Sequence, residues 1–364
     1  MRTILVTGGA GFIGSHLVDE LLEHGNDVRV LDSLVGQVHG SGARPLHLSA
    51  HAELLVGDVR DAEAVRRALD GVDAVVHLAA RVGVGQSMYE LGEYTSANSY
   101  GTAVLLQELL DRPVQKLLVA SSMSIYGEGA SAPVPAAERR REDLDARRFE
   151  PRGAGGEELT PLPTPETKPA ANSSVYALTK YDQERLCLVF GDAYDTPTVA
   201  LRFFNVYGPR QALSNPYTGV LAIFASRLLN GRPPLVYEDG EQRRDFVNVA
   251  DVARACVLAL ESNGADGRAL NIGSGKSVTV NEIAEKLARV LDVDLAPEVT
   301  GKFRAGDIRH CFADITLARE LLRYEPEVGL EEGMAELAEW LGEQTAEDRV
   351  DLATEELVSR GLAR

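Results

Sequence analysis

Cysteine is scarce in this sequence. Its three cysteines, Cys187, Cys256 and Cys311, lie far apart among 364 residues and form no CxxC pair. A disulfide framework and a thiolate zinc site both need several cysteines at regular spacings, so we expect neither, and no metal site. Isolated cysteines are typical of a reducing compartment, so we expect a cytoplasmic protein.

Long apolar runs and an excess of basic charge are also missing. No stretch reaches the ~18 apolar residues of a membrane-spanning helix. A strand pattern begins at Thr3, so no signal peptide is expected. The net charge is −18, from 37 Lys and Arg against 55 Asp and Glu. Such a protein repels phosphate backbones and anionic lipids, so we expect neither nucleic acid nor membrane as a partner. An anionic small ligand would need basic residues placed locally.

The first 120 residues alternate short apolar segments with amphipathic ones. The segments expected as strands cover 3–7, 27–32, 52–58, 73–80 and 115–122, and those expected as helices cover 12–24, 61–69 and 95–111. Continuous Val, Leu and Ile runs are typical of strands buried on both faces. Short connections between alternating strands and helices predict an α/β fold, a doubly wound parallel sheet with right-handed crossovers.

Residues 131–172 break this alternation, with dense charge over 136–150 and many glycines and prolines over 151–169. We expect a surface insertion, either a mobile excursion or a rim over a substrate site. Further segments then resume the alternation. They predict helices over 174–191, 249–261, 280–291 and 330–342 and a strand over 198–204.

The length predicts two lobes. The first domain is expected over 1–200, and a smaller C-terminal α/β lobe over 201–345 returns some strands and helices to it. Residues 346–364 are expected to form an acidic tail without a motif.

Three glycines spaced three apart, Gly8, Gly11 and Gly14, follow the first expected strand and open the first expected helix. In a dinucleotide-binding loop such glycines allow a tight turn, close approach of a pyrophosphate, and close packing of helix on strand. A plain tight turn is the alternative. Asp32 ends the second strand 18 residues after Gly14 and is placed to accept from ribose hydroxyls. Ser33, not an arginine, follows it, which favours NAD over NADP.

Other residues are expected near the cofactor. Asp58 ends a strand and could accept from an adenine amino group, or cap the following helix. Ala79 and Ala80 are small residues after a strand, which indicates close approach of a cofactor or plain packing. The remaining candidates come from the glycine loop and from strand ends: Phe12, Ile13, Val59 and Leu78.

Tyr176 and Lys180 lie four residues apart in VYALTKYD, so a helix places the phenol and the ammonium on one face. This pair, downstream of a nucleotide loop, indicates hydride chemistry on a carbinol. A free phenol has a pKa of about 10, too high for a base near neutrality. A nearby ammonium and an oxidised nicotinamide both favour the phenolate.

Six motifs carry a resemblance to a known family. TGGAGFIGSH, GDVRD, HLAA, SSMSIYG, YALTK and RFFNVYGPRQ occur in the order found in extended short-chain dehydrogenases/reductases, the superfamily of nucleotide-sugar epimerases and dehydratases. The likeness runs from residue 1 to about 342. Within the superfamily the chain is most similar to dTDP-L-rhamnose 4-epimerase-like and UDP-glucose 4-epimerase-like members. The resemblance implies a Rossmann-type fold, NAD, and a homodimer formed through helices matching 95–111 and 174–191.

The resemblance also assigns roles at the reacting centre. It implies that Tyr176 is the catalytic base and that Lys180 holds the nicotinamide ribose. It further implies that Ser122 binds the reacting hydroxyl and that Asn98 supports a proton relay. Family dehydratases carry an Asp-Glu pair directly after the serine or threonine. This sequence has a methionine and Ser124 there, so dehydration is disfavoured and Ser124 is expected to bind substrate.

On the substrate side the resemblance implies that Asn205, Arg244 and Arg304 contact a sugar diphosphate, because guanidinium groups suit phosphate oxygens. Cys311 aligns where galactose epimerases vary a residue lining the sugar pocket, although buried packing is the alternative. The expected function is an NAD-dependent 4-epimerase of dTDP- or UDP-hexoses, acting through a bound 4-keto intermediate. The alternatives are a one-way 4-ketoreductase or dehydrogenase, and a non-catalytic regulator that senses NAD.

Overall fold

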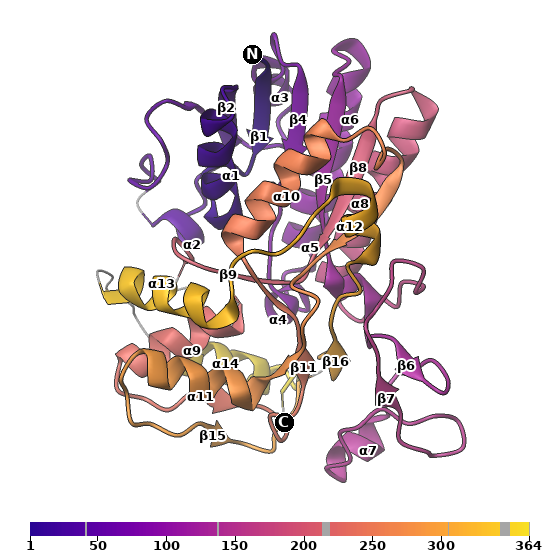
Figure 1. Cartoon of the computed structure of the whole chain (residues 1–364), viewed down its shortest axis with the longest axis vertical. Helices are drawn as coiled ribbons and strands as arrows, with labels where there is room; N and C mark the ends of the chain where they lie inside the picture. The colour runs from indigo at the N-terminus through magenta and orange to yellow at the C-terminus, as the bar shows by residue number, and fades with distance from the viewer. Residues whose placement is uncertain (41, 137, 213–218, 305, 343–349, 364) are drawn as a thin grey trace.

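A seven-stranded parallel sheet forms the centre of the first lobe in the computed structural model, which describes residues 1–40, 42–136, 138–212, 219–304, 306–342 and 350–363 (Figure 1). Its strand order is β13-β8-β5-β4-β1-β2-β3, and all neighbours are parallel. The strands are β1 (Thr3–Thr7), β2 (Asp27–Asp32), β3 (Glu53–Val56), β4 (Ala74–His77), β5 (Lys116–Ser122), β8 (Thr198–Phe203) and β13 (Arg268–Ile272). The predicted doubly wound, Rossmann-type sheet is confirmed.

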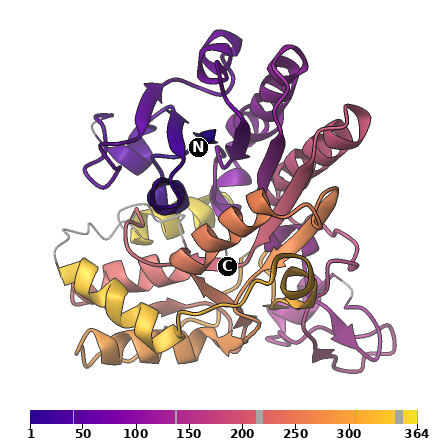
Figure 2. The ribbon, with the colours of Figure 1, turned by 45° about the horizontal axis from the view of Figure 1, so that its top comes forward.

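Helices cover both faces of this sheet (Figure 2). One face carries α1 (Phe12–Glu23), α10 (Val249–Glu261) and α12 (Thr316–Leu322), and the other carries α3 (Ala62–Ala68), α6 (Gly101–Asp111) and α8 (Val175–Ala193). Successive side chains of a strand point to opposite faces. Accordingly, Ile4 and Val6 lie in the core under α1 and α10, while Leu5 lies in the core under α3 and α6. Burial on both sides explains why β1 reads as a continuous apolar run.

The chain reverses direction across the sheet between β1 and β4. From β1 it runs outward to β2 and β3, and it then returns to add β4 on the opposite side of β1. Ligands of open parallel sheets bind at such a switch point, beyond the carboxyl ends of the strands. Gly8 follows β1, Ala79 follows β4, and Ser122 ends β5, so the predicted site residues gather at this edge.

The second lobe packs three helices around its own core. These are α9 (Val220–Leu229), α11 (Val280–Val290) and α13 (Leu330–Gly342). A capping box between Thr279 and Glu282 starts α11. Short strands pair beside them: β9 (Asn205–Tyr207) with β12 (Phe246–Asn248), β10 (Leu235–Val236) with β15 (Glu298–Val299), and β11 (Arg243–Arg244) with β14 (Val278–Thr279) and β16 (His310–Cys311).

Short helices complete the fold around the strand ends. They are α2 (Gly36–His39), α4 (Val84–Ser87), α5 (Leu91–Tyr94) and the 3₁₀ turn η2 (Met123–Tyr126). The helix expected over 95–111 begins as a π-helix, η1 (Thr95–Tyr100), and continues as α6. Wide π turns frequently occur at functional sites. None of the helices among the described residues combines the length and the apolar character that crossing a bilayer requires.

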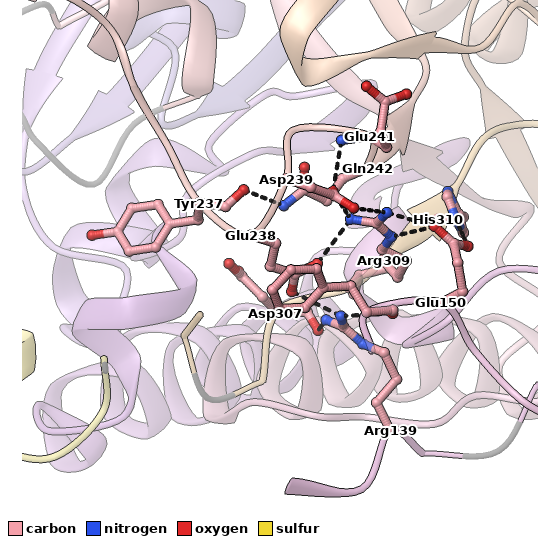
Figure 3. A network of polar contacts seen from close by, with 12 residues as sticks. Arg139, Glu150, Tyr237, Glu238, Asp239, Glu241, Gln242, Asp307, Arg309 and His310 are labelled. Carbon is pink, nitrogen blue, oxygen red and sulfur yellow. Dashed lines mark hydrogen bonds and ion pairs between the residues drawn. The ribbon is translucent and has the colours of Figure 1, made fainter. Parts of the chain in front are cut away.

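The insertion is held by ion pairs against the second lobe, projecting at the lower right of Figure 1. It contains β6 (Ser131–Ala132), α7 (Arg141–Asp145) and β7 (Thr160–Pro161), and β6 pairs with β7. Figure 3 shows the contacts that fix it. Arg139 of the insertion pairs with Glu238 at 2.7 Å, and Glu150 accepts from Arg309 at 2.5 Å and contacts His310 at 2.7 Å. The charges that suggested a solvated excursion are therefore partly buried and paired.

The C-terminal segment folds back onto both lobes. Of the tail expected over 346–364, residues 346–349 and 364 lie outside the described residues, and Val350–Ser359 form helix α14. Asp351 pairs with Arg227 of α9 at 2.8 Å. Leu357 lies against Gly85 of α4, and the guanidinium of Arg360 lies 4.4 Å from the ring of Tyr89. A segment expected to be a featureless tail is thus a helix that spans the two lobes.

Candidate active site

A cavity of about 630 Å³ lies at the carboxyl edge of the sheet, lined by residues of both lobes and of α14. Sixteen of the residues predicted from the sequence line it: Gly8, Gly11, Phe12, Ile13, Gly14, Asp32, Leu78, Ala79, Ala80, Ser122, Ser124, Tyr176, Lys180, Asn205, Arg244 and Arg304. Four others, Asn98, Asp58, Val59 and Cys311, are not among its lining residues. None of the described residues of the insertion lines it, so the rim interpretation of that segment is wrong.

The glycine loop leaves room for a pyrophosphate. Gly8 has a φ of +72°, and a Cβ there would lie 2.8 Å from the backbone nitrogen of Ala79. A Cβ on Gly14 would collide with the backbone of Gly8 and Gly9, whereas one on Gly11 would meet only the Gly8 oxygen at 3.3 Å. Gly11 is also the N-cap of α1 and provides no capping side chain. The first amides of α1 therefore remain available to an anion, as a dinucleotide requires.

Asp32 presents its carboxylate at the same end of the cavity. Its Oδ2 accepts from the Ala10 amide at 3.1 Å and its Oδ1 from the Leu34 amide at 2.9 Å. His39 lies 3.7 Å from Asp32, and burial lowers the pKa of this imidazole. A carboxylate fixed by backbone amides beside a neutral imidazole can accept from ribose hydroxyls and repel a 2′-phosphate.

Asp58 is engaged elsewhere. Its carboxylate receives Nη2 of Arg60 at 2.7 Å, and the hydrogen bonds from Arg60 lower the pKa of Asp58. The cap of the following helix is Asp61, which accepts from the Glu63 amide. The helix cap predicted as the alternative for Asp58 is therefore wrong, and Arg60 binds both of its oxygens. Its neighbour Val59 packs against Gly101 of α6 and is buried.

Ser122 and Tyr176 both lie in the cavity wall. Ser174 caps α8 by accepting from the Ala177 amide at 3.1 Å, which puts Tyr176 in the first turn. Ser124 donates to the Ser122 hydroxyl at 2.9 Å. Burial raises the pKa of Tyr176, and the hydrogen bond with Ser122 opposes this rise. The Lys180 charge alone therefore does not outweigh the burial of the phenol.

Lys180 lies on the same side of α8, almost fully buried. Burial lowers the pKa of its ammonium to about 8. Its Nζ donates to Oε1 of Gln183 at 2.7 Å. The pair predicted from the YALTK spacing is thus brought to one cavity wall, but the hydrogen-bond partner of Lys180 was not predicted.

Asn98 lies behind the cavity in η1. Its Oδ1 accepts from the Arg81 amide at 2.7 Å, and its Nδ2 donates to the Arg81 carbonyl at 3.1 Å and to Thr179 Oγ1 at 3.0 Å. These bonds join η1 to the loop after β4 and to α8. The side chain predicted to support a proton relay is therefore engaged in holding three elements together.

Two arginines provide positive charge at the opposite end of the cavity. Arg244 donates to the carbonyls of Arg243 at 3.0 Å, of Arg309 at 2.9 Å, and of Ile308. Burial lowers its pKa, and among the described residues no ion pair joins Arg244 to a carboxylate. Arg304 pairs with Asp307 at 2.8 Å and lies 4.5 Å over the ring of Tyr237. Arg244 is therefore a partly buried cation whose charge a bound anion would balance.

Three amide oxygens on the cavity wall lack partners among the described residues: Asn205 Oδ1, Gln211 Oε1 and Gln242 Oε1. Buried polar atoms are normally hydrogen-bonded, so three unpaired acceptors indicate a ligand rich in donors. Only Asn205 was predicted. Gln211 ends the RFFNVYGPRQ motif and Gln242 precedes the two arginines of β11, which are signals that could have identified both. Ala353, Thr354 and Leu357 of α14 also line the cavity, and no motif marked them.

Cys311 is placed away from the cavity. It lies on β16, beside Arg244 of β11, and its Sγ is 3.8 Å from Thr164 Oγ1 of the insertion. It is 1% exposed, and burial raises its pKa to about 12. The predicted contact with a sugar is absent because the thiol faces the insertion, as the packing alternative described.

Comparisons with known proteins identify the family. The model of the NAD dependent epimerase/dehydratase family matches residues 4–273. The dTDP-L-rhamnose 4-epimerase of Burkholderia thailandensis is 36% identical over 353 residues, covering 94% of this chain and 96% of that one. The UDP-N-acetyl-alpha-D-glucosaminuronate decarboxylase of Bacillus cytotoxicus is 30% identical, covering 94% of this chain and 98% of that one. The UDP-glucose 4-epimerase of Thermus thermophilus, solved with NAD, superposes with a TM-score of 0.76 at 32% identity, covering 94% of this chain and 100% of that one. The chain therefore belongs to the NAD dependent epimerase/dehydratase family of enzymes, and NAD is its cofactor.

Proposed function

We propose that this protein is a nucleotide-sugar 4-epimerase, which oxidises carbon 4 of the sugar to a bound ketone and reduces it again from the opposite face. One observation carries the proposal. Ser122, Tyr176 and Lys180 line one cavity, which also holds the glycine loop. A phenol held beside a serine hydroxyl is suited to remove a proton from a carbinol.

The chain's own residues handle the proton. NAD held by the glycine loop, Asp32 and Lys180 would supply the hydride acceptor and donor for carbon 4. Ser122 positions the reacting hydroxyl, and Ser124 orients Ser122 through their 2.9 Å bond. Tyr176 takes the hydroxyl proton as the C–H bond breaks and gives it back when the ketone is reduced. The Lys180 ammonium favours the phenolate against the burial that raises the pKa of Tyr176. The cycle is redox-neutral.

The substrate end of the cavity supports a nucleoside diphosphate sugar. Arg244 and Arg304 suit the diphosphate, because a guanidinium binds phosphate oxygens through paired N–H groups. The unpaired oxygens of Asn205, Gln211 and Gln242 suit hydroxyl and N–H donors. Binding of the nucleotide anchors the substrate while the sugar turns between the two hydride transfers. A thymidine or uridine diphosphate hexose is the proposed class.

The residues after Ser122 disfavour dehydration. Met123 and Ser124 stand there, and both line the cavity. Neither side chain is an acid that could protonate a leaving hydroxyl. A one-way 4-ketoreductase or dehydrogenase uses the same residues and differs by a net change in the cofactor. A non-catalytic regulator would not need the Ser122, Tyr176 and Lys180 set.

The test is a panel of dTDP- and UDP-hexoses, their 6-deoxy forms and a hexuronate, with products identified by NMR. We expect inversion at carbon 4 of at least one substrate with no net change in the nicotinamide absorbance. Accumulation of reduced cofactor would identify a dehydrogenase instead, and release of carbon dioxide from the hexuronate a decarboxylase. A wild-type enzyme that binds these sugars and changes none of them would contradict the proposal.

We further propose that two copies pair through α6 and α8, which pack against each other. Tyr100 at the end of η1 is 58% exposed, and Leu178 and Val189 of α8 are 55% and 56% exposed. Clustered exposed apolar side chains are typical of an interface. We expect light scattering to give a dimer and Val189→Arg to give a monomer. A wild-type monomer would contradict this proposal, and the cytoplasmic location stays a prediction.

A further inference from the structure

We propose that Gln183 is a positioning residue of this site, which holds the Lys180 side chain in place and in its charged form. The inference rests on the proposed function, because it concerns how the proton-transferring tyrosine is kept ready. Gln183 lies one helical turn after Lys180 on α8 and is 0% exposed. It is not among the residues that line the cavity, so it acts through Lys180 and does not touch a ligand.

The contacts of Gln183 fix which way its amide points. Its Oε1 lies 2.7 Å from Lys180 Nζ, and its Nε2 lies 2.8 Å from Thr102 Oγ1 and 3.3 Å from the Ala79 carbonyl. Thr102 donates its own hydrogen to the Asn98 carbonyl at 2.6 Å, so its oxygen is left to accept. A flipped amide would place an N–H against the ammonium and an oxygen against the Ala79 carbonyl. The orientation that presents the carbonyl to Lys180 gives the ammonium an acceptor and the Ala79 carbonyl a donor, and it places Gln183 Nε2 3.2 Å from His77 Nε2.

His77 of β4 completes the same network. Burial lowers the pKa of His77 to about 3, so the ring is neutral and carries one hydrogen. Its Nε2 lies 2.9 Å from Thr102 Oγ1 and its Nδ1 lies 2.7 Å from Thr7 Oγ1. Its Nε2 also lies 3.2 Å from Gln183 Nε2, and the ring is neutral in either tautomer. The imidazole therefore adds no charge beside Lys180.

The acidic neighbours of Lys180 offer little competition to Gln183. Glu184 follows on α8, and Arg202 of β8 binds both of its oxygens, at 2.6 and 2.9 Å. The thiol of Cys187, also on α8, has its pKa raised to about 12 by burial, so it is neutral. Tyr176 is the remaining titratable group beside Lys180 on its own helix. A neutral amide oxygen is thus the hydrogen-bond acceptor of the ammonium within the described residues.

This geometry has a consequence for the proton affinity of Lys180. Burial alone favours the neutral amine, because a desolvated ammonium is costly. A hydrogen bond to the ammonium favours the charged form. Loss of the Gln183 carbonyl therefore lowers the pKa of Lys180, and a neutral Lys180 no longer favours the Tyr176 phenolate.

The experiment titrates Lys180 by NMR in the NAD-loaded protein with ¹³Cε-labelled lysine. The sequence contains six lysines, Lys116, Lys168, Lys180, Lys276, Lys286 and Lys302, so the spectrum is readable and a Lys180→Arg variant assigns the signal. We expect Gln183→Met to lower the pKa of Lys180 by about one unit and Gln183→Glu to raise it by about as much. Gln115→Met is the control, because it changes an exposed glutamine at the far end of the sheet. It should leave the pKa of Lys180 unchanged.

Loosened packing would shift the pKa of Lys180 in the same direction in both Gln183 variants. Shifts of opposite sign therefore cannot come from packing. Shifts of the same sign, or no shift, would overturn the proposal. If Gln183→Met fails to fold, Thr102→Val removes the acceptor that orients the amide and should give a smaller shift downward. A second readout is the phenolate absorbance of Tyr176, taken as the difference from Tyr176→Phe, which should rise at higher pH in Gln183→Met.

These titrations need no substrate, so they are independent of the reaction. Shifts of opposite sign in a protein that converts no sugar would support the positioning role while contradicting the proposed function. Epimerisation without such shifts would contradict the positioning role alone.

Discussion

Arg244 gives the sharpest test of the substrate end, because its neighbour Arg243 is a matched control. Both lie on β11, two residues long, with side chains on opposite sides. Arg244 lines the cavity, whereas Arg243 is not among the lining residues and donates to Ser277 Oγ at 3.3 Å. Arg244→Met and Arg243→Met remove the same charge from adjacent positions. A difference between them therefore reports the cavity and not the net charge of the protein.

The size of the effect follows from the contacts. A hydrogen bond to a charged group contributes about 1.5–3 kcal/mol, which corresponds to roughly a 10- to 150-fold change in Kd. We expect Arg244→Met to weaken binding of UDP or dTDP by that factor, while Arg243→Met changes it less than about twofold, because Arg243 does not line the cavity. Isothermal titration calorimetry on the NAD-loaded enzyme gives both values.

Stability must be measured beside affinity. Arg244→Met also leaves the carbonyls of Ile308 and Arg309 without a donor, and unsatisfied buried acceptors cost about 1–3 kcal/mol each. Arg244→Lys keeps the charge and should bind with an intermediate affinity, because a single ammonium cannot reach every partner of a guanidinium. An equal loss of nucleotide affinity in the Arg243 and Arg244 variants, or no loss in either, would refute the assignment of Arg244 to diphosphate binding.

Four further predictions concern other parts of the chain. Tyr176→Phe should lose at least ~10²-fold in turnover while retaining NAD, and near-normal turnover would contradict its role as base. Asp32→Ala should reduce the preference for NAD over NADP, measured as the occupancy of each cofactor; equal occupancies in the wild type would show the preference to be wrong. Leu357→Asp should detach α14 from α4, raise the KM for the nucleotide sugar and speed amide exchange over 350–363, whereas unchanged exchange would place α14 elsewhere. Burial raises the pKa of Glu150, but hydrogen bonds from His310 and Arg309 outweigh it and hold the value at about 2. Stability from Glu150 is therefore present above its unfolded pKa of about 4.5 and is lost towards pH 2. Glu150→Gln should flatten acid denaturation over that range, and an unchanged acid limb would contradict the ion pair.

Local spacing made much of the site predictable. The three glycines, the strand-end Asp32 and the Tyr176–Lys180 pair depend on neighbours within a few residues of each other, so strand and helix periods place them. The sheet was predictable for the same reason, because its strands are short apolar runs bounded by turns. Arg244 came from resemblance alone, since a lone arginine beside another carries no local signal.

The side-chain contacts that the sequence did not predict depend on packing between residues far apart in the chain. Cys311 faces Thr164, which is distant in sequence and comes from the insertion. In the sequence, Gln183 does not differ from other polar helix residues. Its role depends on acceptors for its amide that come from the loop after β4 and from α6. Such contacts join residues about 80 to 150 positions apart, where periodicity carries no information.

The charges of the insertion explain how so acidic a protein can leave a cation open at its cavity. Asp307, Glu128 and Glu238 are the carboxylates whose charges act on Arg244, and Asp307 pairs with Arg304 while Glu128 pairs with Arg139. Arg139 pairs with Glu238 at 2.7 Å, and Arg309 pairs with Glu238 at 3.0 Å and Asp239 at 2.6 Å (Figure 3). Burial raises the pKa of Glu238 and the Arg139 charge opposes this rise, and the two ion pairs occupy the carboxylate. With its acidic neighbours already paired, Arg244 is left with carbonyl partners and a charge that a diphosphate can balance. The insertion thus acts on the substrate end of the cavity without lining it.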